Sequence, residues 1–383
     1  MNDERYRDSL PADAVIRTFP WAAALAVVII FAVELAWVQP RWTSWTEPLN
    51  EVIHTKKQHL LSPEPVDSLA IFGDSRMFHI EPKRVLRALH MSGHADNFAW
   101  AWCGYEAYDA MLRGLIAHKD APPKVIIVSS HPEMPAYVPL WTTMGGNADM
   151  RERLFQAAPI FSQIDTLVRL HEYHNAWQQF ERTLMPPSFV YAPSIRTYLK
   201  DKLHRRPYDT LPAERERIVS NYRESGAFMY HAGGEVKPQE LIDFEKTAGP
   251  FKVHKNSLAR LAFGQFLATA EAHQVEVIMV PLPVPAPIYD IYSTRGILSD
   301  YAAQVSKWKQ QYSTFHPLGS VALRYPAEDF LDPGHVNEKG REKHEAKVEK
   351  VLSDFATGQT SAGESDLAGA DQKSSTSKTE ALP

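Results

Sequence analysis

Short apolar runs alternate with stretches of helical spacing along most of this chain, and this alternation limits its fold more than any other feature. The clearest runs are residues 68–72 (SLAIF), 124–128 (KVIIV) and 275–280 (VEVIMV), with a weaker one at 96–99. Runs this short and apolar are typical of strands buried on both faces of a sheet. Helical spacing occurs at residues 82–90, 106–118, 261–273 and 338–354. The pattern predicts βαβ units and an α/β fold, a flavodoxin-like three-layer sandwich with a mostly parallel sheet.

The alternation is interrupted once in the middle and stops near the end. Residues 150–260 are rich in Arg, Glu, Tyr and His and contain no convincing buried strand. They predict a helical insertion at about 141–260 within one folded domain of residues 42–355. From residue 356 the sequence contains no aromatic residue and no apolar periodicity. Such a segment buries too little apolar surface to offset the entropy of ordering, so residues 356–383 are expected to form a disordered tail.

Composition excludes several classes of protein. Hydrophobic residues make up 44% of the chain, enough for a large core. The 41 Lys+Arg and 46 Asp+Glu give a formal net charge of −5, so no basic footprint for nucleic acid exists and no nucleic-acid partner is expected. The one cysteine, Cys103, excludes an intramolecular disulfide and a zinc site with several Cys ligands. His171 and His174 lack the spacing of a metalloprotease helix, and neither a metal nor a cofactor is expected.

A long apolar run lies near the N-terminus. The 18-residue run Trp21–Val38 (WAAALAVVIIFAVELAWV) contains a single charged residue, Glu34. A helix of that length rises about 27 Å, close to the thickness of a hydrocarbon core of about 30 Å. Its tryptophans, Trp21 and Trp37, suit the two membrane interfaces. The run predicts a transmembrane anchor over residues 21–38. The alternatives are a cleaved signal peptide, because the uninterrupted apolar run ends at Val33, and a buried helix.

The charges that flank this run predict its orientation. Arg5, Arg7 and Arg17 precede it, whereas only Arg41 follows it closely. Positively charged residues are retained on the cytoplasmic side, so residues 1–20 are expected in the cytoplasm and the folded domain outside it. The sequence thus predicts a single-pass protein of the inner (cytoplasmic) membrane whose domain lies in the periplasm.

A serine follows the first expected strand, in the sequence Gly73-Asp74-Ser75-Arg76. The carboxyl edge of a parallel sheet is where open α/β folds bind ligands. A turn into a helix also directs backbone N–H groups outward, where they can stabilise an oxyanion. Ser75 is therefore a candidate nucleophile, although Asp and Ser are also ordinary N-cap residues at such a turn. His79, four residues further on, either lines the same pocket or lies on the surface.

A second candidate motif, Asp332-Pro333-Gly334-His335, lies just before the last expected helix. A serine hydroxyl is a weak nucleophile near neutral pH and needs an adjacent base, which in turn needs a partner that fixes its tautomer. His335 and Asp332, three residues apart, are suited to these two roles. The alternative is that the motif caps the last helix and His335 is solvated.

Together the two motifs resemble those of the SGNH/GDSL hydrolase superfamily. More narrowly, the chain is similar to the membrane-anchored SGNH-like proteins that O-acetylate exported polysaccharides, such as the alginate acetylation proteins. The resemblance covers roughly residues 65–140 and 265–355. It implies Ser75 as nucleophile, His335 as general base and Asp332 as the acid that orients the base.

The other two blocks of the family match less closely. Gly104 is the nearest counterpart of the glycine whose N–H enters the oxyanion hole. The third block of the family carries an Asn, but this chain has Ser130 and His131 there, and either is expected to donate in its place. Arg76, next to the serine, is expected to contact substrate.

Three functions compete on these residues. The first is a membrane-anchored serine acyltransferase that O-acetylates an exported polysaccharide and receives acyl groups from a multi-helix membrane protein. The second is an SGNH esterase or deacetylase that uses the same triad. The third is a non-catalytic glycan-binding or assembly component that keeps the fold. Transfer and hydrolysis share the acyl-enzyme and differ only in whether a sugar hydroxyl or water accepts the group.

Overall fold

The computed structural model describes most of the expected domain except its middle. The described residues are 21–33, 36, 48–63, 65–66, 68–99, 103–130, 132, 164–165, 168–169, 177, 227, 236–237, 240–241 and 258–359. Nearly all of the expected insertion at 141–260 and the tail from residue 360 onward therefore lie outside the described residues. The last helix runs to Ala356, one residue into the expected tail.

The described strands form one sheet in which every pairing is parallel. The strands are β1 (Leu69–Phe72), β2 (Ala95–Asn97), β3 (Val125–Ser130), β4 (Glu276–Pro285), β5 (Phe315–Pro317) and β6 (Ala322–Tyr325). Their order is β2-β1-β3-β4-β5, and β6 pairs with the second half of β4. The predicted α/β class and parallel sheet are confirmed. All residues of β1 and β3 are buried, as their uninterrupted apolar runs indicated.

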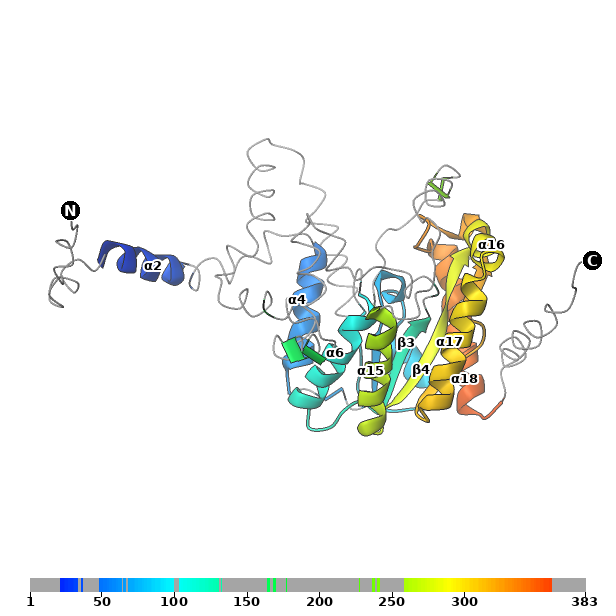
Figure 1. Ribbon diagram of the computed structural model, residues 1–383, viewed down its shortest axis with the longest axis horizontal. Coiled ribbons are helices and arrows are strands. Elements are labelled where there is room, and N and C mark those ends of the chain that lie inside the picture. Colours follow the sequence, from blue (N-terminus) through cyan, green and yellow to red (C-terminus); the bar gives the residue numbers. More distant parts are fainter. Residues whose placement is uncertain are drawn as a thin grey trace, which may run out of the picture.

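Helices cover both faces of this sheet (Figure 1). On one face α5 (Pro82–Ala88) packs against α18 (Glu338–Ala356). On the other face α6 (Tyr105–His118) packs against α15 (Leu258–Ala272), and α17 (Ile297–Gln311) lies beside them. Two further helices lie at the margins, α4 (Pro48–Leu61) against α6 and α16 (Ala286–Thr294) against α17 and β6.

Strand β4 continues five residues beyond the end at residue 280 that its sequence predicts. The extra segment contains Pro281, Pro283 and Pro285. Because the three prolines alternate, their missing N–H groups all fall on one side of the strand. Strand β3 ends opposite Pro281, and β6 pairs with the residues that follow. The N–H groups of the intervening residues, Leu282 and Val284, lie on the other side of the strand and are kept. The strand therefore tolerates its prolines.

Aromatic side chains fill the core between the sheet and the three helices α6, α15 and α17 that cover one of its faces. Phe263 lies at its centre, with ring centroids 4.5 Å from Tyr105, 4.6 Å from Trp308 and 5.7 Å from Phe266. Tyr105, which stands beside the expected oxyanion glycine, is fully buried in this cluster. Its ring therefore belongs to the core.

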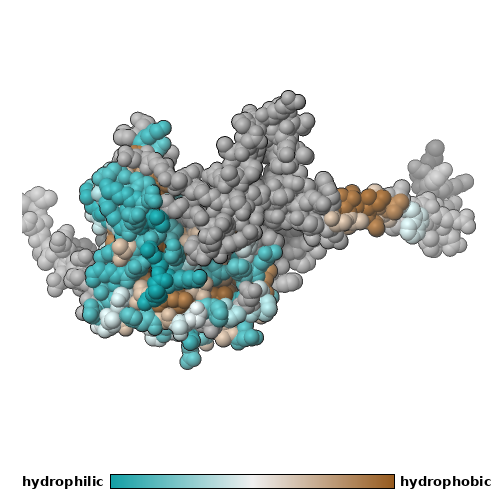
Figure 2. All heavy atoms as spheres, turned by 180° about the vertical axis from the view of Figure 1, so that it is seen from behind, coloured by the Kyte–Doolittle hydropathy of each residue, from teal (hydrophilic) through white to brown (hydrophobic). Residues whose placement is uncertain are grey.

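Helix α2 (Trp21–Val33) contrasts with this body. Most of its described side chains are exposed, Trp21 by 69%, and Figure 2 shows it as a hydrophobic rod, whereas the coloured surface of the body is mostly hydrophilic. Over the part of the chain that the structure describes, no helix combines the length and apolar character that crossing a membrane requires. Most of the remainder of the expected anchor, residues 34–38, lies outside the described residues.

A buried lysine joins α4 to the body. The side chain of Lys56 is 2% exposed, and its ammonium donates a hydrogen bond of 2.5 Å to the carbonyl of Ala99. The ring centroid of Phe78 lies 5.1 Å from the same nitrogen. Burial lowers the pKa of Lys56 to about 7, and the nearby Asp96 and Cys103 oppose the shift only in part.

Replacement of Lys56 should therefore change how stability depends on pH. Between pH 7 and 10.5 the unfolded chain keeps the proton of Lys56 while the folded chain loses it. The free energy of unfolding then rises with pH, by at most about 1.4 kcal/mol per pH unit. In Lys56→Met this rise should be absent. Urea unfolding of the full chain in detergent from pH 6 to 10 measures the difference, with the exposed Lys347→Met as a control for loss of one charge. A difference independent of pH would contradict the assignment.

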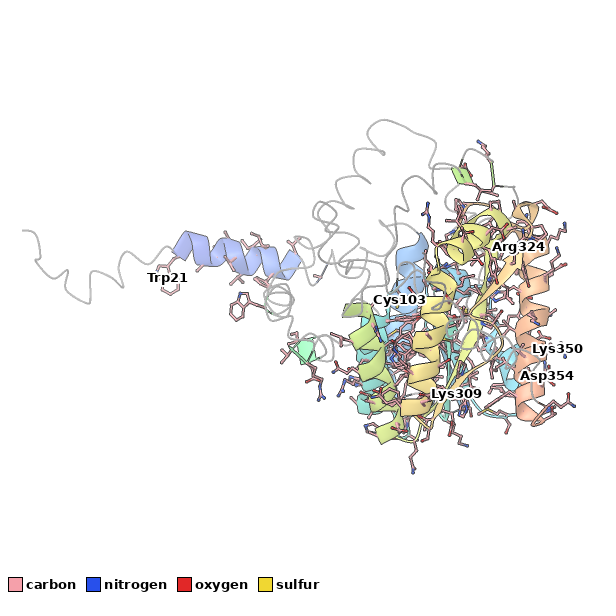
Figure 3. The ribbon with its side chains drawn as sticks, turned by 45° about the vertical axis from the view of Figure 1, so that its right-hand side comes forward. Trp21, Cys103, Lys309, Arg324, Lys350 and Asp354 are labelled. Atoms are coloured by element: carbon pink, nitrogen blue, oxygen red, sulfur yellow. The ribbon has the colours of Figure 1, made fainter. Side chains whose placement is uncertain are left out.

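The thiol of Cys103 donates a weak hydrogen bond of 3.7 Å to the carbonyl of Gly104, and we expect packing to dominate its contribution to stability. It is 1% exposed and lies inside the body, in the segment that leads into α6 (Figure 3). We expect Cys103→Ala to lower the free energy of unfolding by about 1–2 kcal/mol, the cost of a small cavity. Thermal unfolding of the two proteins measures this, and a variant that fails to fold would show that the thiol does more than fill space.

Candidate active site

The Ser75 turn, which we define as residues 74–80, begins two residues after β1 ends. The 3-10 helix η2 (Ser75–Met77) forms its centre, and the carboxylate of Asp74 accepts a hydrogen bond of 2.9 Å from the N–H of Arg76. Asp74 is therefore the N-cap, and the hydroxyl of Ser75 is not used for capping. A Cβ at Gly73 would lie 2.4 Å from the Cγ of Met77, so only glycine lets the turn close this tightly.

Arg76 contacts its own turn. Its guanidinium donates to the carboxylate of Asp74 over distances of 3.0 and 3.3 Å, and both side chains are less than one-fifth exposed. This pair braces the loop on which Ser75 sits. The expectation that Arg76 contacts substrate stays a prediction.

Asn97, at the end of β2, holds the same turn from the neighbouring strand. The amide nitrogen of this fully buried side chain donates to the carbonyls of Met77 and Ile80, each at 2.9 Å. Its amide oxygen accepts the N–H of Ala99 at 2.8 Å. Asn97 is not among the candidate residues that the sequence motifs indicated. Its position as a polar residue at the carboxyl end of a buried strand was the available signal.

The loop that carries His335 is fixed at its base. An antiparallel bridge pairs Phe330 with Val336, and the N–H of Leu331 donates to the carbonyl of His335 at 2.8 Å. Asn337 follows as the N-cap of α18 and accepts the N–H of Gly340 at 3.1 Å. The capping role considered for Asp332 and His335 thus belongs to Asn337.

A second close approach ties the start of α18 to this loop. A Cβ at Gly340 would lie 2.2 Å from the carbonyl oxygen of Asp329, which leaves room only for glycine. The carboxylate of Asp329 is fully buried and meets the ammonium groups of Lys343 at 2.5 Å and Lys339 at 3.3 Å. These contacts fix the helix relative to the loop in front of it.

The two loops meet at the carboxyl edge of the sheet. The Oγ of Ser75 lies 2.7 Å from the Nε2 of His335, and the Nδ1 of His335 lies 2.8 Å from one carboxylate oxygen of Asp332 and 3.0 Å from the other. The structure therefore brings together the three residues that the two motifs suggested. The side chains of His335 and Asp332 are 34% and 43% exposed, so an outside molecule can approach them.

The surroundings of Asp332 define which atoms carry protons. Burial raises the pKa of the Asp332 carboxyl, but hydrogen bonds from the His335 ring and from the N–H groups of Gly334 and His335 outweigh it and hold the pKa below its usual value. Asp332 is thus ionised at neutral pH and can only accept. The proton of neutral His335 must then lie on Nδ1, which leaves the lone pair of Nε2 facing the hydroxyl of Ser75.

Two backbone N–H groups are candidates for an oxyanion hole. The Ser75 N–H has no acceptor among the described residues. Gly104 is the N-cap of α6, a position whose N–H has no acceptor within the helix. It follows β2, the neighbour of β1, so both groups lie at the same edge of the sheet.

The third-block substitutes fit this role less well. The hydroxyl of Ser130 is buried and donates to the carbonyl of Val321 at 2.6 Å. Its only proton is therefore already used, and the expected donation to an oxyanion is not supported. His131 lies outside the described residues.

Comparisons with known proteins add no identification. The chain matches no family model, and neither the curated proteins nor the solved structures contain a significant match to it.

Proposed function

We propose that the chain is a membrane-anchored, extracytoplasmic serine acyltransferase that O-acetylates an exported polysaccharide. The observation that carries this proposal is the chain of hydrogen bonds from Ser75 through His335 to Asp332, with distances of 2.7 and 2.8 Å. Each atom faces the partner that nucleophilic catalysis requires: a hydroxyl on the lone pair of an imidazole, and a carboxylate on its N–H.

In the first half-reaction the Oγ of Ser75 attacks the carbonyl carbon of the acyl donor, and its proton passes to the Nε2 of His335. The carbonyl oxygen becomes an oxyanion, for which the N–H groups of Ser75 and Gly104 are the proposed donors. When the intermediate collapses, the bond to the leaving group breaks and His335 returns the proton to that group. Ser75 is left as an ester. Asp332 holds the ring and stabilises its positive charge without taking the proton.

In the second half-reaction a sugar hydroxyl gives its proton to His335 and attacks the ester carbonyl. Collapse of this intermediate transfers the acyl group to the sugar, and His335 returns the proton to Ser75. An esterase would use water as the acceptor in the same step. The partial exposure of His335 suits a bulky acceptor such as a glycan chain.

The SGNH assignment is part of this proposal. The strand order β2-β1-β3-β4-β5 is that of flavodoxin-like sheets, in which the ligand lies at the carboxyl edge where the strand order reverses, between β1 and β3. Ser75 lies at that point. The absent third-block Asn leaves the oxyanion hole dependent on backbone donors among the described residues.

The exposed apolar helix α2 supports the membrane anchor and the inner-membrane location. The described side chains from Val27 to Phe31 are about half exposed, a cost that lipid would remove. We propose that the run Trp21–Val38 spans the membrane, and that a multi-helix membrane protein delivers the acyl group to the periplasmic domain.

The proposed topology predicts where a C-terminal reporter works. Helix α18 ends at Ala356 and the described chain at residue 359, so a fusion beyond this point leaves the body intact. We expect a reporter that functions only in the cytoplasm to be inactive there, and one that functions only in the periplasm to be active. The opposite pattern would contradict the orientation.

Replacement of the nucleophile should abolish acyl transfer. In Ser75→Ala no ester can form, whereas folding should change little because Asp74, not Ser75, caps the turn. His335→Ala should be equally defective, and Asp332→Ala less so because Asp332 does not itself carry the proton. The double variant Ser75→Ala/His335→Ala should be little worse than either single variant, since the residues act as one unit.

The measurement is the acyl content of the exported glycan in cells that carry each variant at equal protein level. Ser299→Ala is a matched control, because it removes an exposed hydroxyl on α17 that donates to the carbonyl of Gly296 at 2.9 Å. Wild-type acylation by Ser75→Ala would rule out the nucleophile and favour a binding or assembly role.

A further inference from the structure

Two buried histidines lie behind the candidate triad. The Nε2 of His79, in the Ser75 turn, is 2.9 Å from the Nδ1 of His344 on α18. The Nε2 of His344 in turn lies 3.0 Å from the carbonyl oxygen of Pro281 on β4. His79 is 6% exposed and His344 is fully buried, so the surface position considered for His79 is wrong.

The carbonyl of Pro281 fixes the protons of this pair. A carbonyl only accepts, so the Nε2 of His344 carries a proton and its Nδ1 is an acceptor. The Nε2 of His79 must then be the donor to that Nδ1. Both rings are neutral in this arrangement, as their burial requires.

The electrostatic surroundings keep both rings neutral. Burial lowers the pKa of His79 well below its ordinary value, and His344, Arg341 and His335 lower it further. Burial lowers the pKa of His344 to about 4, against the opposing effect of the Pro281 carbonyl. The bond between the rings is therefore intact at neutral pH.

This bond joins the two elements that carry the triad, the Ser75 turn and the chain segment that leads from His335 into α18. His79 lies on the turn that presents Ser75, and His344 lies on α18, which begins three residues after His335. Asn97 fixes the turn to the sheet, but among the contacts described here the histidine bond is the one that links the turn to α18 from within the core. A shift of either element would change the distance between the Oγ of Ser75 and the Nε2 of His335.

We propose that His79 and His344 are positioning residues that set the distance between Ser75 and His335. They touch neither reacting group and act through the turn and the helix that carry the triad. The inference rests on the proposed function, because it concerns the geometry of the same nucleophile. A misplacement of about 1 Å costs on the order of 100-fold in rate, so a modest shift should be measurable.

Matched amide variants test the proposal without a large change in polarity. Glutamine places an amide nitrogen where the Nε2 of histidine lies, and asparagine places an amide oxygen where Nδ1 lies. His79→Gln and His344→Asn therefore keep the bond between the two positions. His79→Asn and His344→Gln carry the same amide groups, but the shorter or longer side chain moves the amide away from the position of the histidine nitrogen, so the bond is lost. Val348→Ala, which removes a buried side chain one turn further along α18, controls for loss of packing.

The measurement is the rate at which a fluorophosphonate probe labels Ser75 in the full chain in detergent, with the melting temperature recorded alongside. We expect His79→Gln and His344→Asn to label within about threefold of wild type. His79→Asn and His344→Gln should label at least about tenfold more slowly. Val348→Ala should melt at a lower temperature but label at the wild-type rate when assayed well below that temperature.

Three results would overturn the proposal. Equal labelling of the two amides at each position would show that the bond does not position Ser75. Equal slowing by Val348→Ala would show a general effect of destabilisation. Labelling of Ser75→Ala as fast as wild type, or no labelling of wild type, would instead remove the proposed nucleophile and the inference with it.

Discussion

Parallel pairing of β1 with β3, and of β3 with β4, is the constraint on which the rest of the structure depends. It aligns the carboxyl ends of strands that are far apart in the sequence, and the loops that follow them meet at one edge. The loop that carries His335 follows β6, which pairs with β4, so the hydrogen bond between Ser75 and His335 spans 260 positions and needs this alignment. With one cysteine in the chain, no intramolecular disulfide can hold these loops. Hydrogen bonds and buried polar side chains do so instead.

Several buried polar groups around the site have specific partners. Asn97 binds three backbone groups, Asp74 caps the turn and pairs with Arg76, and Asn337 caps α18. A buried polar group without a partner costs about 1–3 kcal/mol. Loss of either partner in these contacts would therefore leave the other buried and unpaired. Such contacts add little net stability, but they select one arrangement of the two loops. That selection is what a nucleophile and its base require.

Several residues with two interpretations are resolved by their surroundings. Ser75 faces His335 and leaves capping to Asp74. His79 is buried and lies 2.9 Å from His344, so it is not a surface residue. Residue type and spacing are the same for a cap and a nucleophile, and for a buried histidine and a surface one. Only the neighbours supplied by distant parts of the chain distinguish them.

The sequence by itself determined the α/β class, the parallel sheet and the central strands, because a strand buried on both faces must be apolar throughout. It also indicated the triad, since the serine and the Asp–His pair flank predictable elements. Helix α17 was not predicted, although Ile297, Tyr301 and Val305 recur at helical spacing. Strands β5 and β6 were not predicted either, because they are too short to show a pattern. Only the tertiary structure decided that β4 continues through its prolines and that His79 meets His344. Those contacts join segments whose local sequences contain no information about each other.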